Sequence, residues 1–115
     1  MNIQIVLKLL HQLEQLRRHE SWTRPQLAAY QAEALRRLRA YAYARSPFYQ
    51  QFHQGLTDRP LHELPVLTKA MMMEHFDEFV TDRSVSLRDV RSHLQSDPDG
   101  SKYLGRYRVN ATSGS

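Results

Sequence analysis

The sequence predicts a mainly α-helical chain of about five helices that ends in one β-strand. Apolar side chains recur every three or four positions through most of residues 2–45, which is the period of an amphipathic helix. Each of the four helices expected after the first one is preceded by a Ser or Thr in the position of an N-cap. Residues 103–109 instead predict a strand, with Tyr103, Leu104, Tyr107 and Val109 as its bulky members.

Length and composition set the class of protein. The chain has 115 residues, 41% of them apolar and 24% charged, as expected for one globular domain. No segment approaches the roughly 18 uninterrupted apolar residues that span a bilayer, and residues 1–10 are not a secretory signal. The chain has no cysteine, which excludes disulfides and thiolate chemistry. We therefore expect a cytoplasmic protein without a membrane span.

The first predicted helix covers about residues 2–19 and is apolar over a broad surface. Ile3, Val6 and Leu10 lie on one stripe, whereas Ile5 and Leu9 fall beside it. A helix with two apolar sides needs two neighbours, or one neighbour and a second chain. We therefore expect a homo-oligomer formed through exposed apolar helix surface.

The second predicted helix extends to about residue 45. Thr23 is its expected N-cap, Pro25 lies in the first turn, and Gln26 completes a capping box three residues after the cap. Three shorter helices are predicted by the same signals. The first of them begins after the cap Ser46 and stops at Gly55. The next begins after Thr68 and extends to about Phe79, and the last begins after Ser86 and extends to about Leu94.

The carboxyl end carries the clearest functional signal. We divide the chain into a helical region, residues 1–103, and a strand with a truncated phosphate-binding loop, residues 104–115. The strand leads into Thr112, Ser113, Gly114 and Ser115. Hydroxyls and backbone N–H groups of such a turn can converge on an anion. One strand cannot form a sheet, so its partners lie beyond residue 115 or in another copy.

Three other kinds of site are disfavoured. The six histidines lack the spacing of metal ligands. The acidic residues Glu74, Asp77 and Glu78 have no partner acid placed to form a working pair. Residues 1–45 hold eight Lys and Arg against three acids, a balance that attracts nucleic acid or an anionic membrane. No nucleic-acid-binding motif accompanies them, and solvated helix faces explain the arginines.

Three blocks of the sequence, taken in order, resemble the amino-terminal region of phenylacetate–coenzyme A ligase-like enzymes. The blocks are residues 38–49, which contain Ser-Pro-Phe-Tyr, residues 64–69, Leu-Pro-Val-Leu-Thr-Lys, and residues 107–115, Tyr-Arg-Val-Asn-Ala-Thr-Ser-Gly-Ser. These enzymes belong to the adenylate-forming (AMP-binding) superfamily and include members labelled as capsular polysaccharide biosynthesis proteins. The resemblance covers about residues 35–115.

The resemblance implies an amino-terminal fragment of a larger α/β enzyme, an ATP-dependent acyl- or aryl-CoA ligase. In that family the loop that begins as Thr112, Ser113, Gly114 and Ser115 binds the β- and γ-phosphates of ATP. The implied cofactors are ATP and Mg²⁺, with coenzyme A as a thiol acceptor. The pockets for adenine and for the acid would lie outside the chain. We therefore expect no catalytic residue, no bound cofactor and no activity in these 115 residues alone, with the remainder of the enzyme as partner. The alternative is a self-contained helical module for protein interaction or dimerisation.

Overall fold

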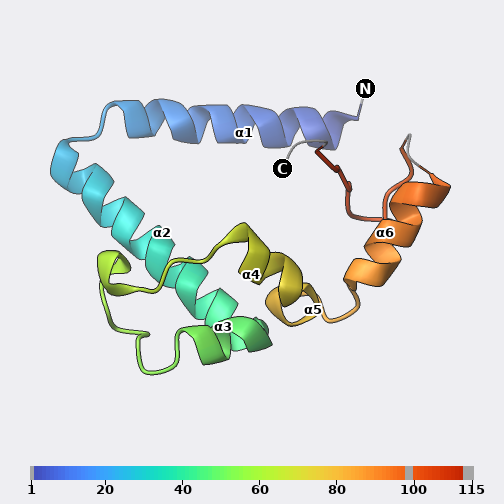
Figure 1. Cartoon of the computed structure of the whole chain (residues 1–115). Helices are drawn as coiled ribbons and strands as arrows, with labels where there is room; N and C mark the ends of the chain where they lie inside the picture. The colour runs from blue at the N-terminus through green and yellow to red at the C-terminus, as the bar shows by residue number, and fades with distance from the viewer. Residues whose placement is uncertain (1, 98–99, 113–115) are drawn as a thin grey trace. The chain divides into compact units, whose positions relative to one another are not determined.

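The computed structural model describes residues 2–97 and 100–112, which form helices joined by loops (Figure 1). The prediction of a mainly α-helical chain is confirmed. The described residues contain six α-helices and one 3₁₀-helix: α1 (Ile3–Glu20), α2 (Arg24–Arg45), α3 (Pro47–Phe52), η1 (Leu61–Glu63), α4 (Lys69–Glu74), α5 (Phe76–Phe79) and α6 (Leu87–Ser96). The chain divides into two compact units, residues 1–39 and 40–115, with the boundary inside α2.

In the first unit, α1 and α2 begin within one residue of the predicted positions. The Asn2 side chain caps α1 by accepting a hydrogen bond from the Gln4 amide at 3.0 Å. The capping box of α2 is present, since the Thr23 amide donates to Gln26 Oε1 at 2.8 Å and the Gln26 amide donates to Thr23 Oγ1 at 3.4 Å. The rings of His19, Trp22 and Tyr30 pack together beside this turn, with centroids 4.1 to 5.2 Å apart.

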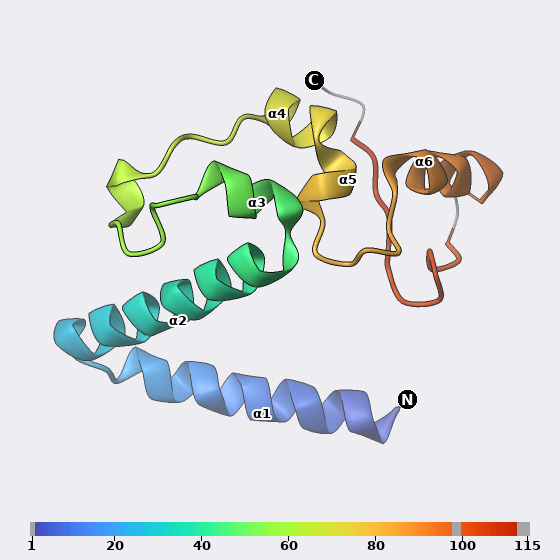
Figure 2. The ribbon, with the colours of Figure 1, turned by 90° about the horizontal axis from the view of Figure 1, so that it is seen from below.

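The second unit is organised around Ser46, which is fully buried. Its Oγ accepts from the Tyr49 amide at 3.3 Å, which confirms the predicted cap of α3. The same hydroxyl lies 2.7 Å from the carbonyl oxygen of Phe79, to which it donates. One side chain thus joins the start of α3 to the end of α5, and the two helices lie side by side (Figure 2).

The predicted single helix after Thr68 is interrupted, so that prediction was wrong in detail. His75 has φ −109° and ψ 26°, outside the helical range, and it separates α4 from α5. Its amide makes the last bond of α4, to the Met71 carbonyl at 3.0 Å. Its carbonyl then receives the first bonds of α5, from the amides of Glu78 and Phe79. The helix therefore restarts in a new direction at His75.

The predicted carboxyl-terminal strand is absent from the described residues. Tyr103 and Tyr107 instead form an isolated antiparallel bridge, with N–O distances of 2.8 and 3.0 Å. Leu104 and Gly105 have φ of 51° and 69°, the left-handed conformation that turns the chain back at once. Residues 108–112 have no regular structure. The prediction of a strand over residues 103–109 was wrong because Leu104 and Gly105 make a tight turn in its middle.

Candidate phosphate-binding site

Of the predicted phosphate-binding residues, the structure describes only Thr112. It is exposed and belongs to the irregular segment that follows the Tyr103–Tyr107 turn. Ser113, Gly114 and Ser115 lie outside the described residues. Thr112 offers one hydroxyl and one backbone amide to a phosphate oxygen, and this donor set alone is too small to hold ATP.

An open hollow of about 370 Å³ lies beside the segment that leads to Thr112. Its lining residues are His93, Asp97, Gly100, Ser101, Arg108, Val109 and Asn110. His93 Nε2 lies 2.9 Å from the Ser101 carbonyl oxygen. Because a carbonyl can only accept, this ring nitrogen carries the hydrogen. The ring of His93 also meets the buried ring of Tyr103 edge to face, with centroids 5.6 Å apart.

The charges that line this hollow nearly cancel. Arg108 supplies a permanent cation, whereas Asp97 supplies a carboxylate that accepts a hydrogen bond from the Ser101 hydroxyl. Asn110 adds an amide that can both donate and accept. Such a surface suits a small polar group, and it is a weak site for a polyphosphate because the carboxylate opposes its charge.

Asp82 anchors the turn that precedes Arg108. One carboxylate oxygen accepts from Arg106 Nη2 at 2.7 Å and from the Tyr107 hydroxyl. The other accepts from the backbone amide of Ser84 at 2.9 Å and from its hydroxyl. Arg106 also reaches the Ser84 hydroxyl at 3.1 Å. We call Asp82, Ser84, Arg106 and Tyr107 the Asp82 cluster; it fixes where the segment toward Thr112 begins.

Hydrogen bonding in the Asp82 cluster shifts two pKa values. The hydroxyl of Ser84, followed by that of Tyr107, holds the pKa of the Asp82 carboxyl well below its usual range. The hydrogen bond to Asp82 raises the pKa of the Tyr107 phenol. Asp82 therefore stabilises the fold above its unfolded pKa of about 4, and Tyr107 does so below its unfolded pKa of about 10. The cluster contributes fully from about pH 5 to about pH 9.

The Asp82 cluster was missed by sequence reasoning. Its two halves, Asp82 with Ser84 and Arg106 with Tyr107, are more than twenty positions apart, as in the Arg106 bond to Asp82 with a separation of 24. The only local signal is the short Asp-x-Ser turn formed by Asp82 and Ser84. Nothing in the sequence pattern links that turn to Tyr107.

We expect Asp82→Asn to lower the pKa of Tyr107 back toward about 10, because an amide stabilises the protonated phenol less than a carboxylate does. The titration can be followed by NMR of ¹³C-labelled tyrosine rings. Asp58→Asn is the matched control, since Asp58 lies on an exposed loop outside the Asp82 cluster. An identical Tyr107 titration in the wild-type protein and in Asp82→Asn would contradict the geometry of this cluster.

Two of the five arginines of α2, Arg36 and Arg37, pair with an acid on the same helix. Glu33 accepts from Arg36 at 2.8 and 2.9 Å and from Arg37 at 2.9 Å. The hydrogen bond from Arg36, which has the largest effect, and that from Arg37 lower the pKa of Glu33 to about 2. The pairing at positions three and four apart is typical of a solvated helix face. It supports the interpretation of these residues as helix surface.

Residues 2–97 and 100–112 contain neither a cluster of metal-ligating side chains nor a membrane-spanning helix. No three side chains of His, Asp or Glu gather there in a group that could hold a metal ion. No helix in the same part of the chain is both long and apolar enough to cross a bilayer.

Comparison of the chain with family models, with curated proteins and with solved structures finds no match.

Proposed function

We propose that the chain is the amino-terminal part of an ATP-dependent acyl- or aryl-CoA ligase-like adenylate-forming enzyme. The observation that carries this proposal is the ordered set of three sequence blocks, which ends in Tyr-Arg-Val-Asn-Ala-Thr-Ser-Gly-Ser at residues 107–115. In that enzyme, residues 1–100 serve as scaffold, and Thr112, Ser113, Gly114 and Ser115 contact the β- and γ-phosphates of ATP. The expected compartment is the cytoplasm.

The proposed reaction has two steps. A carboxylate attacks the α-phosphorus of ATP, which forms an acyl-adenylate and releases pyrophosphate. A thiol such as that of coenzyme A then attacks the acyl carbon and releases AMP. The hydroxyls of Thr112 and Ser113 would donate hydrogen bonds to phosphate oxygens, and Gly114 would let the backbone approach them closely. The Asp82 cluster supports this role because it fixes the chain five residues before Thr112.

We expect the gene product that continues past Ser115 to catalyse carboxylate-dependent exchange of pyrophosphate into ATP. Residues 1–115 alone should show no exchange and should bind Mg-ATP more weakly than about 1 mM, because half a phosphate loop lacks the helix that follows it. In the longer protein, Thr112→Val should raise the KM for ATP about tenfold by removing one donor. Thr57→Val is a control for the same chemical change, at an exposed position away from the loop and from the Asp82 cluster.

Two results would contradict the proposal. One is a natural stop codon directly after the codon of Ser115. The other is micromolar Mg-ATP affinity of residues 1–115 in isothermal titration, which would show a complete site within the chain.

The second candidate function is a self-contained helical interaction module. The observation that favours it is the exposure of large apolar side chains on the first unit, such as Ile3 at 73% and Leu16 at 59%. Such surface is normally covered by a partner. The ligase candidate predicts pyrophosphate exchange by the longer gene product, whereas the interaction-module candidate predicts none.

A further inference from the structure

Two unfavourable features lie next to each other in the Tyr103–Tyr107 turn. The side chain of Tyr103 is buried, and its hydroxyl has no hydrogen-bond partner among the described residues. Such a hydroxyl loses its bonds to water and forms none in the fold. The next residue, Leu104, has φ 51°, the one positive value of a non-glycine residue in the part of the chain that the structure describes. This left-handed conformation crowds the Cβ atom against the backbone.

Contacts of the Asp82 cluster hold the turn in this conformation. Arg106 and Tyr107 donate to the Asp82 carboxylate across 24 and 25 positions of the chain. Within the turn, the amides of Tyr103 and Tyr107 each donate to the carbonyl oxygen of the other residue, at 2.8 and 3.0 Å. Backbone strain of this kind persists only where surrounding contacts fix it, and it is frequent in ligand clamps and switch regions.

An extended backbone relieves both unfavourable features. Every residue of a strand has negative φ, so Leu104 leaves the left-handed region when the segment extends. Release of the turn also lets the Tyr103 hydroxyl bond to water. Tyr103, Tyr107 and Val109 are residue types that are enriched in strands. The same residues therefore suit two conformations, of which the closed turn is the one that the Asp82 cluster selects.

We propose that the Tyr103–Tyr107 turn is a latch that opens as a unit while the helices stay folded, with Asp82 as the residue that holds it closed. In the open state residues 103–109 are extended. Opening moves Arg108 and the segment toward Thr112, because they follow the turn directly. The latch does not rest on the ligase function. If that function holds, opening would carry Thr112 away from the place that the Asp82 cluster gives it.

Amide hydrogen exchange of the full chain, followed by NMR, tests this proposal. The amides of Tyr103 and Tyr107 donate across the turn, so their protection from exchange reports its opening. The amide of the buried Ser46 donates to the Ala42 carbonyl at 2.8 Å and reports unfolding of the helices around it. We expect the two turn amides to be protected at least about tenfold less than the Ser46 amide.

Two substitutions of Tyr by Phe should act in opposite directions. Tyr103→Phe removes a hydroxyl without a partner, so the closed turn becomes more stable and exchange of its amides slows about fivefold. Tyr107→Phe removes the hydroxyl that donates to Asp82 and should speed the same exchange about tenfold. Leu104→Gly should slow it about threefold, because glycine adopts a φ of 51° without strain.

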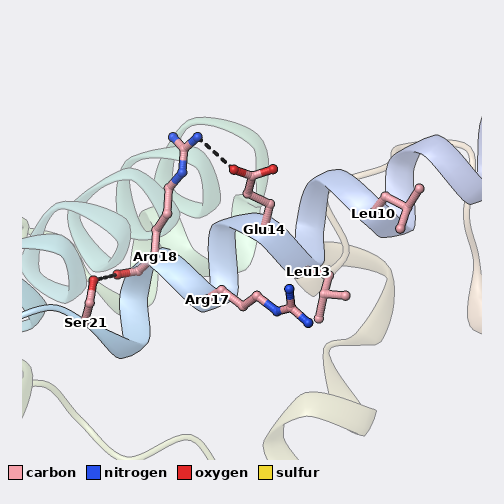
Figure 3. Close-up of a pocket in the computed structure, with 6 residues that line it drawn as sticks. All are labelled: Leu10, Leu13, Glu14, Arg17, Arg18 and Ser21. Carbon is pink, nitrogen blue, oxygen red and sulfur yellow. Dashed lines mark hydrogen bonds and ion pairs between the residues drawn. The ribbon is translucent and has the colours of Figure 1, made fainter.

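Asp82→Asn should also speed this exchange about tenfold, since an amide accepts more weakly than a carboxylate. Glu14→Gln is its matched control and should leave the exchange unchanged. Glu14 likewise pairs with an arginine, because its carboxylate lies 3.1 Å from Arg18 Nη2 beside an open hollow on α1 (Figure 3). The proposal is overturned if the turn amides are as protected as the Ser46 amide, or if Tyr103→Phe speeds exchange as Tyr107→Phe does.

Discussion

Ser46→Ala is expected to lower the free energy of unfolding by about 2–3 kcal/mol, the largest effect of any single substitution considered for this chain. The alanine removes the cap of α3, which Ser46 provides by accepting from the Tyr49 amide. It also leaves the carbonyl oxygens of Phe79 and Glu78 without the hydroxyl that donates to them at 2.7 and 3.2 Å. Urea unfolding followed by circular dichroism measures the loss.

Ser86→Ala is the matched control for this prediction. Ser86 caps α6 by accepting from the Asp89 amide at 3.2 Å. It should cost about 1 kcal/mol, because only the helix cap is lost. If Ser46→Ala were no more damaging than Ser86→Ala, the long-range bonds of Ser46 would contribute nothing to stability.

Phe48→Ala is expected to cost about 2 kcal/mol, because the ring is half-buried at the centre of an aromatic cluster. The ring centroid lies 4.9 Å from that of Phe52 within α3, 5.5 Å from that of His75, and 5.9 Å from that of Phe79 in α5. The truncation therefore removes packing both within α3 and between α3 and the helices after Thr68. The same urea titration measures it.

Tyr41→Ala gives the comparison for an aromatic ring outside this cluster. Tyr41 is 50% exposed, and the Arg45 guanidinium lies 5.2 Å from the centroid of its ring. The expected cost is below about 1 kcal/mol. Equal losses for Phe48→Ala and Tyr41→Ala would show that the aromatic cluster does not hold α3 and α5 together.

The parts of the fold that the sequence predicts are those set by local chemistry. The predicted caps Thr23, Ser46, Thr68 and Ser86 each accept from an amide three residues ahead. Such bonds depend on a few neighbouring residues, so their pattern is visible without the fold. The helix starts were therefore predicted to within one or two residues.

The remaining features were not predicted, either because they join residues far apart in the chain or because the local sequence pattern was ambiguous. The second role of Ser46, as donor to Phe79, spans 33 positions, and the Asp82 cluster spans up to 25. The Tyr103–Tyr107 turn was not predicted because a glycine such as Gly105 occurs both within strands and in turns. The break at His75 arises from its own backbone conformation, which no neighbouring glycine or proline signals. For the candidate site, Thr112 stays a prediction of the sequence, and the residues that hold the chain before it were not predicted.

The hydrogen bond between Ser46 and Phe79 closes a loop of the chain that contains the irregular segment around η1. The entropy lost in closing such a loop grows only with the logarithm of its length. Residues 54–67 can therefore lengthen or shorten by several positions at a cost of a few tenths of a kcal/mol, provided that the two ends still meet at the serine hydroxyl. Relatives of this chain should differ most in length there, and an inserted peptide tag should be tolerated best at the same place.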